Sequence, residues 1–155
     1  MSMKRMTRDE VFNRLESGMS LAGLNLEEVD LSRANLSGVD CSGANFHRAR
    51  LTGANLAGAR LCKANLRRCE LVGADLSGAD LSDADLRNSF FNDCNLSGAR
   101  LERADVRFAK FTGARLEGAS FAGAVYDQMT RFDPDQVRVF SAMVKKGPEG
   151  VFIKK

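Results

Sequence analysis

The chain has 155 residues, a length typical of a single domain. Hydrophobic residues make up 44% and charged residues 28%, a balance that excludes an intrinsically disordered chain. The formal net charge is only +3, from 23 basic and 20 acidic residues, so charge alone indicates neither a nucleic acid nor a membrane surface as partner. The single histidine excludes sites that need two imidazoles.

The first element predicted along the chain is a short helix within residues 1–18. Thr7 and Glu10 have the spacing of a capping box, and Gly18 is placed to end the helix. Val11 lies on the apolar face that this helix would bury. No apolar run follows the basic N-terminal residues, so the sequence predicts no secretory signal, and we expect a cytoplasmic protein.

Between residues 19 and 128 the sequence repeats every five residues. Stepping by five from Leu21 to Tyr126 gives 22 consecutive positions without a polar residue. Alanine stands two places before 15 of these 22 positions, and 11 of the 14 glycines stand two places after one of them. A period of five fits neither an α-helix nor a flat strand, because the apolar positions would spread around the helix or alternate between the faces of the strand.

The period fits a chain that turns a corner every five residues, so that four corners close a square coil of 20 residues. The leucine or phenylalanine and the preceding alanine would point inward, and the other three positions would face solvent. Glycine at one turn position is expected where the backbone needs a positive φ. The 110 residues from 19 to 128 make about 5.5 such coils, stacked at the spacing of paired strands.

Several units match in full the A-(D/N)-L-x-x pattern of pentapeptide repeat proteins, which the sequence resembles. These units are Ala34-Asn35-Leu36, Ala54-Asn55-Leu56, Ala64-Asn65-Leu66, Ala74-Asp75-Leu76, Ala79-Asp80-Leu81 and Ala84-Asp85-Leu86. The resemblance implies an all-β fold, a right-handed quadrilateral parallel β-helix. It implies much less about activity, since known members include DNA mimics that protect gyrase, secreted effectors and many proteins with no assigned role. The motif residues are core residues, so no functional site transfers.

Residues 129–155 are predicted to form a second cap and a tail. Asp133 and Pro134 indicate the start of a helix that would present Phe140 and Met143 and end at Gly147. The apolar tail 151–153 either closes the last coil or docks on a second copy of the chain, as C-terminal segments do in some dimeric members of the family. The sequence thus leaves open a homodimer formed through residues 133–155.

Residues 20 apart should stack in columns on the outside of the coil, and most columns indicate a structural role. Two columns alternate in sign, and two others stack asparagines that can hydrogen-bond along the coil. The members of these columns are Asp40, Arg60, Asp80 and Arg100; Lys63, Asp83 and Arg103; Asn25, Asn45 and Asn65; and Asn35 and Asn55.

One corner differs and is the predicted interaction patch. Arginines recur there without an opposite charge in their own column, beside two phenylalanines at positions that should face outward. Arginine and aromatic side chains are enriched at protein interfaces. The patch consists of Arg67, Arg87, Phe90, Arg107, Phe108 and Lys110. Two alternatives remain: Asp85 and Asp105 neutralise the arginines, or a terminal segment covers the phenylalanines.

No other constellation indicates chemistry. The four cysteines, Cys41, Cys62, Cys69 and Cys94, lack zinc or redox spacing, and the longest apolar stretch, 137–144, is too short to cross a membrane. The filled core leaves no cavity for a substrate. We therefore expect no enzyme, no metal and no cofactor.

The function that this pattern favours is a non-catalytic scaffold that binds another protein through one face of the coil. The first alternative is a gyrase-binding DNA mimic that confers resistance to topoisomerase poisons. Residues 19–128 carry 13 basic and 14 acidic residues, a net charge of −1, whereas a mimic needs a continuous anionic surface. The second alternative is binding of a polyanion through the arginine column; direct DNA binding is not expected, because the repeat region has no basic excess.

Overall fold

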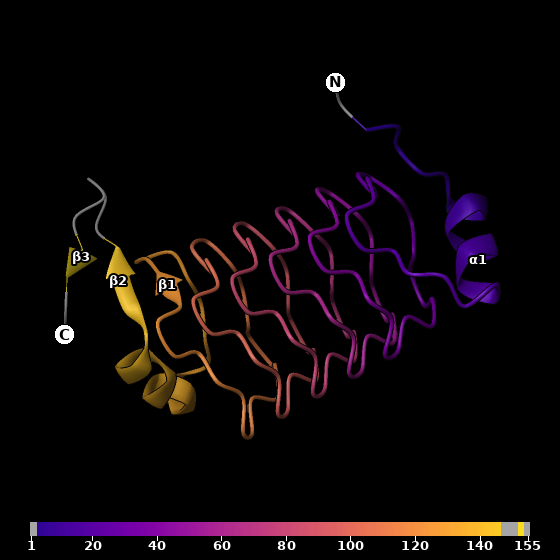
Figure 1. Ribbon diagram of the computed structural model, residues 1–155. Helices are drawn as coiled ribbons and strands as arrows, with labels where there is room; N and C mark the ends of the chain where they lie inside the picture. The colour runs from indigo at the N-terminus through magenta and orange to yellow at the C-terminus, as the bar shows by residue number, and fades with distance from the viewer. Residues whose placement is uncertain (1–2, 147–151, 154–155) are drawn as a thin grey trace.

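A computed structural model describes residues 3–146 and 152–153. The chain winds into an elongated coil whose turns lie one above another (Figure 1). Parallel bridges join residues 20 apart, beginning with Arg5 and Asn25 and continuing along the rod. Because each turn of the coil contains four five-residue units, this spacing is the square coil that the sequence predicts.

Each corner is a β-turn that the repeat itself closes. The N–H of Ala34 donates to the carbonyl of Leu31 at 3.0 Å, and equivalent bonds recur at most other corners. The third residue of the turn has a φ near +60° in every unit from Gly18 to Gly123. Glycine adopts this conformation without a steric cost, which explains why it is concentrated at this position.

The core is a stack of identical layers. The Leu or Phe of each unit points inward and is almost always fully buried, together with the small residue two places earlier. Phe91 and Phe111 stack with ring centroids 4.9 Å apart, and Phe132 continues the stack at 4.7 Å from Phe111. Leu116 is only half-buried, because it borders a hollow of about 410 Å³ at the C-terminal end of the rod.

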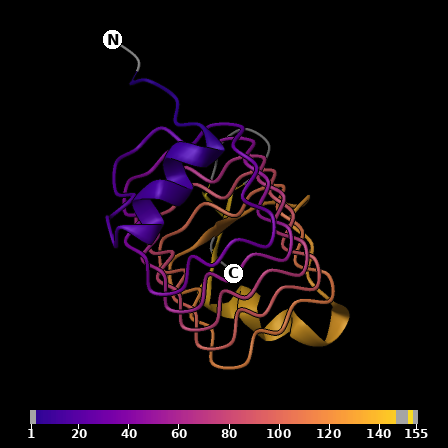
Figure 2. The ribbon, with the colours of Figure 1, turned by 90° about the vertical axis from the view of Figure 1, so that its right-hand side faces the viewer.

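The N-terminal end of the coil is covered by helix α1, Arg8–Glu16. The helix begins at the N-cap Thr7, whose side chain accepts the Glu10 N–H while Glu10 accepts the Thr7 N–H. Val11 is fully buried and belongs to the same core cluster as the leucines. Seen along the coil, α1 lies across its opening (Figure 2).

The C-terminal end is closed differently from the prediction. Strand β1, Val125–Tyr126, pairs in parallel with β2, Val144–Lys146, and β2 pairs antiparallel with β3, Phe152–Ile153. Between β1 and β2 lies a 3₁₀ helix, η1, Pro134–Ala142, so the helix expected to reach Gly147 is wrong beyond Ala142. The open edge of β1 offers backbone hydrogen bonds, and the chain leaves the helix to satisfy them.

The last bridge of the ladder is irregular. Lys110 pairs with Arg131, 21 residues later, because the unit after Tyr126 has six residues instead of five. The extra residue is absorbed in a turn in which Asp127 accepts the N–H groups of Met129 and Thr130. The coil therefore continues past residue 128, and its next inward residue is Phe132, as the ring stacking above shows.

Candidate interaction site at one corner of the coil

One of the four corners carries a side chain on every turn of the coil. Its third turn residues are Glu28, Arg48, Arg68, Asn88 and Phe108, all with φ between 58° and 61°. The opposite corner has only glycines there: Gly18, Gly38, Gly58, Gly78, Gly98 and Gly118. A side chain in the left-handed region costs roughly 1–2 kcal/mol relative to glycine, so this corner bears a backbone strain that the opposite corner avoids.

Phe108 is the most unusual residue of this corner. A bulky side chain at a φ of 61° is rare, and Phe108 remains 48% exposed, so about half of its surface still faces solvent. The turn is held from above, because the Phe108 N–H donates to the Asp127 carboxylate at 3.2 Å. Strained backbone at an exposed aromatic residue is typical of a functional position.

Beside Phe108 lies an open apolar groove. Phe90, on the flat segment that follows the corner, is 37% exposed, and Met129, from the six-residue unit, is 45% exposed. These side chains and Phe108 line a groove of about 440 Å³, together with Arg68, Asn88 and Lys110. Both phenylalanines remain exposed, so within the described residues no terminal segment covers them.

Two cations border the groove. The Nζ atom of Lys110 lies 5.2 Å from the centre of the Phe90 ring, which attracts it through the negative face of the ring. Arg68 lies one turn below Asn88. Within the described residues neither Arg68 nor Lys110 forms an ion pair, and the nearby Asp127 already accepts the N–H groups of the adjoining turn.

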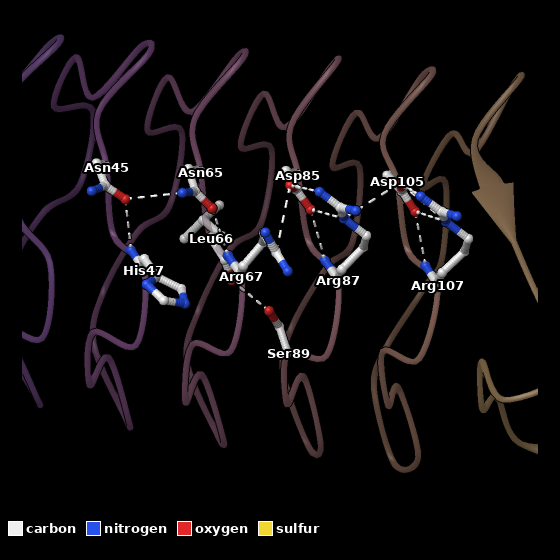
Figure 3. Close-up of polar contacts among 10 residues, drawn as sticks. All are labelled: Asn45, His47, Asn65, Leu66, Arg67, Asp85, Arg87, Ser89, Asp105 and Arg107. Atoms are coloured by element: carbon white, nitrogen blue, oxygen red, sulfur yellow. Dashed lines mark hydrogen bonds and ion pairs between the residues drawn. The ribbon is translucent and has the colours of Figure 1, made fainter.

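The neighbouring arginine column is neutralised, as one of the two alternatives predicts. Arg87 donates to Asp85 from Nε at 2.8 Å and from Nη2 at 2.6 Å, and Arg107 grips Asp105 in the same way (Figure 3). Burial acts to raise the pKa of Asp85, but the hydrogen bonds and charge of Arg87, with the charge of Arg67, outweigh it and hold that pKa below its usual value. These arginines do not form a free cationic stripe.

Below Asp85, the column of Asp85 and Asp105 continues with asparagine amides. Asn65 donates to Asn45 at 3.0 Å, and its side chain accepts the N–H of Arg67 (Figure 3). Arg67 reaches Asp85 of the next turn only at 3.9 Å, and its buried Nε has no hydrogen-bond partner among the described residues. His47 Nδ1 lies 3.0 Å from Glu27 Oε1.

The structure thus divides the predicted patch. Phe90, Phe108 and Lys110 come together at the groove, whereas Arg67, Arg87 and Arg107 turn toward the aspartates beside it. Sequence reasoning left Arg68, Asn88 and Met129 out of the patch. A signal for Asn88 was present, because its column is the one in which no turn residue is a glycine.

The buried hydroxyl and thiol groups have structural roles. Ser89 donates to the carbonyl of Leu66 from inside the core (Figure 3), and Cys69 and Cys94 point to the carbonyls of Phe46 and Leu71. Burial raises the pKa of the Cys94 thiol to about 12, which keeps it protonated and unreactive.

Two searches of the described residues were negative. Residues 3–146 and 152–153 contain no cluster of three or more side chains suited to a metal ion. No helix in this part of the chain is both long enough and apolar enough to span a bilayer.

Solved structures of known proteins show the same architecture. HetL, a pentapeptide repeat protein involved in heterocyst differentiation regulation from the cyanobacterium Nostoc sp. strain PCC 7120, matches with a TM-score of 0.76 and 31% identity, over 82% of this chain and 55% of HetL. The chain therefore spans little more than half of HetL. The pentapeptide repeat protein alr5209 from Nostoc matches with 28% identity over 93% of this chain and all of that protein, with a TM-score of 0.48.

QnrB1, a plasmid-mediated fluoroquinolone resistance protein, matches over 77% of this chain and 78% of its own at 18% identity, with a TM-score of 0.34, too distant to inform function. No curated protein sequence is significantly similar to the chain. The family model for pentapeptide repeats matches residues 17–53, 44–83 and 79–118. With the likeness to HetL, this match shows that the chain belongs to the pentapeptide repeat family.

Proposed function

We propose that this protein is a non-catalytic binding protein that recognises another protein through the groove beside Phe108. One observation carries the proposal: exposed phenylalanines stand at positions 90 and 108, where every other unit except that of Val125 places a polar residue or glycine. Exposed aromatic side chains that border an apolar hollow are typical of protein interfaces. The family membership agrees with this, because pentapeptide repeats form a filled rod.

The gyrase-mimic alternative has less support. A DNA mimic must present an uninterrupted negative surface, because the phosphate backbone of the duplex dominates recognition. Along this rod aspartates are instead paired with arginines, as in the bidentate contact of Arg103 with Asp83 at 2.7 and 2.8 Å. The proposed binding face also bears cations.

The test is affinity capture from the native lysate followed by reconstitution with the captured protein. The groove variant carries Phe90→Asn and Phe108→Gly, which restore residues that the repeat uses at these positions. The matched control carries Val72→Ser and Arg115→Ser, which remove an exposed apolar side chain and a cation outside the groove.

We expect a protein that binds the wild type and the control with equal affinity and the groove variant at least about tenfold more weakly, the loss expected for interface aromatics. The measurement is isothermal titration calorimetry with purified components. Equal binding by all three proteins would place the interface elsewhere on the rod.

A further inference from the structure

We propose that the groove binds an acidic peptide segment that inserts one bulky apolar side chain between Phe90 and Phe108. This inference rests on the proposed function and specifies the chemistry of the partner. The apolar part of the site consists of Phe90, Phe108 and Met129, each more than a third exposed. Methionine adapts its shape to different side chains, and the aromatic rings provide rigid walls.

The charge of the groove selects the flanking residues of the partner. Arg68 and Lys110 line the groove without an ion pair in the described part of the chain. Arg131 follows Lys110 in its column, but its guanidinium donates to the carbonyls of Gln128 and Thr130. Carboxylates on either side of an inserted apolar residue would meet these cations. Of the acids near the groove, Asp127 has its Oδ1 atom engaged by the N–H groups of Phe108, Met129 and Thr130. Glu70, which pairs with Phe90 from the turn below, lies 3.4 Å from Arg50.

The same rings and cations could stack with nucleobases, so the two partner classes must be weighed. A nucleic acid strand needs a continuous cationic track for its phosphates. The column next to the groove does not provide one, because Asp85 and Asp105 occupy the guanidinium groups of Arg87 and Arg107. A short acidic peptide needs only the two cations that border the groove, Arg68 and Lys110.

The experiment uses a phage-displayed library of random short peptides selected on the immobilised full-length protein. The groove variant and the Val72→Ser, Arg115→Ser control are selected in parallel. We expect wild type and control to enrich peptides with an aromatic or aliphatic residue flanked by Asp or Glu, and the groove variant to lose them. Enrichment of basic or uncharged peptides, or equal enrichment on all three proteins, overturns the proposal.

A selected peptide, labelled with fluorescein, then tests the charge pairing by anisotropy. Lys110→Glu and Arg68→Glu should each weaken binding by about fivefold or more, and replacing the peptide's acids with lysine should recover part of that loss. Unchanged affinity in both charge variants overturns the proposal. So does tighter binding of labelled oligothymidylate than of the peptide, if that binding depends on Phe90 and Phe108.

The two tests separate the two proposals. If a captured protein requires Phe90 and Phe108 but the peptide selection yields no acidic apolar motif, the binding function stands and the partner chemistry is wrong. If capture is unaffected by the groove variant, the proposed function itself fails.

Discussion

The guanidinium of Arg87 holds the carboxylate of Asp85 at 2.6 Å, although the two residues are only two positions apart on the same turn. The same column carries Asn25, Asn45 and Asn65 below Asp85, where amides hydrogen-bond along the rod. An amide chain cannot continue through a carboxylate, which has no proton to donate. Above Asn65 the ladder of amides therefore ends, and the aspartates of the same column form ion pairs with the neighbouring arginines instead.

This change predicts an acid-sensitive step in stability. The folded-state pKa of Asp85 lies below its usual value, so the ionised form stabilises the fold above the unfolded-state pKa, and this contribution is lost as pH falls through the folded-state pKa. Asp85→Asn should lower the melting temperature near neutral pH and make its decline below about pH 4 shallower than in the wild type. Thermal melts across acidic pH measure this.

Asp75→Asn is the control, since Asp75 occupies the equivalent position on the opposite face, between Asn55 and Asn95. If the melting temperature of Asp85→Asn declined with falling pH as steeply as that of the wild type, the ion pairs of Asp85 would contribute nothing to the pH dependence.

Leu86→Ala should destabilise the protein by about 2–5 kcal/mol, because Leu86 is fully buried in the middle of the rod and its neighbours cannot collapse into the space. Leu116→Ala, at a half-buried core position near the end of the rod, should cost less. Urea unfolding monitored by circular dichroism gives both values. Equal losses would mean that the stacked layers relax as easily in the middle as at the end.

Phe108→Gly should be more stable than Phe108→Ala by about 1 kcal/mol, since glycine accepts the φ of 61° that alanine resists. Both variants remove the ring, so the difference isolates the backbone strain. Chemical denaturation of the pair provides the measurement. If alanine is equal to or better than glycine, the corner is not strained.

One of the four thiols should react in the native protein. Cys41, Cys69 and Cys94 are buried, and burial raises the pKa of the Cys41 thiol to about 12, whereas Cys62 is partly exposed. Titration with a chromogenic disulfide should therefore detect Cys62 alone before denaturation and all four thiols after it. Loss of the native signal in Cys62→Ser identifies the reactive group.

The inward pattern as far as Phe111 could be predicted because it depends on hydrophobic period alone. Every inward position from Leu21 to Phe111 is fully buried, and the alanine positions follow the same register. The course of a flexible side chain could not be predicted. The position of Arg87 in its column does not indicate whether its guanidinium extends outward or folds back on Asp85, so the sequence left both arrangements open.

The C-terminal end shows a different limit. The segment after Asp133 has local helix signals, yet Val144–Lys146 is a strand because the edge of the last coil supplies backbone partners. Met129 escaped prediction because the five-residue count ends at Tyr126 and gives no sign that the coil continues through a six-residue unit.

That six-residue unit also fixes the position of the groove along the rod. Successive turns of five-residue units have the same backbone geometry. The side chains of Phe90, Phe108 and Lys110 would therefore keep their mutual arrangement if they were placed 20 residues earlier in the sequence. Met129 cannot follow them, because it is carried by the six-residue unit, whose bridge from Lys110 to Arg131 spans 21 residues instead of 20. A lengthening of the repeat by whole turns below residue 68 would leave the groove intact and move it farther from the N-terminal helix. The groove therefore keeps a fixed distance from the C-terminal end of the rod, whatever the number of turns below it.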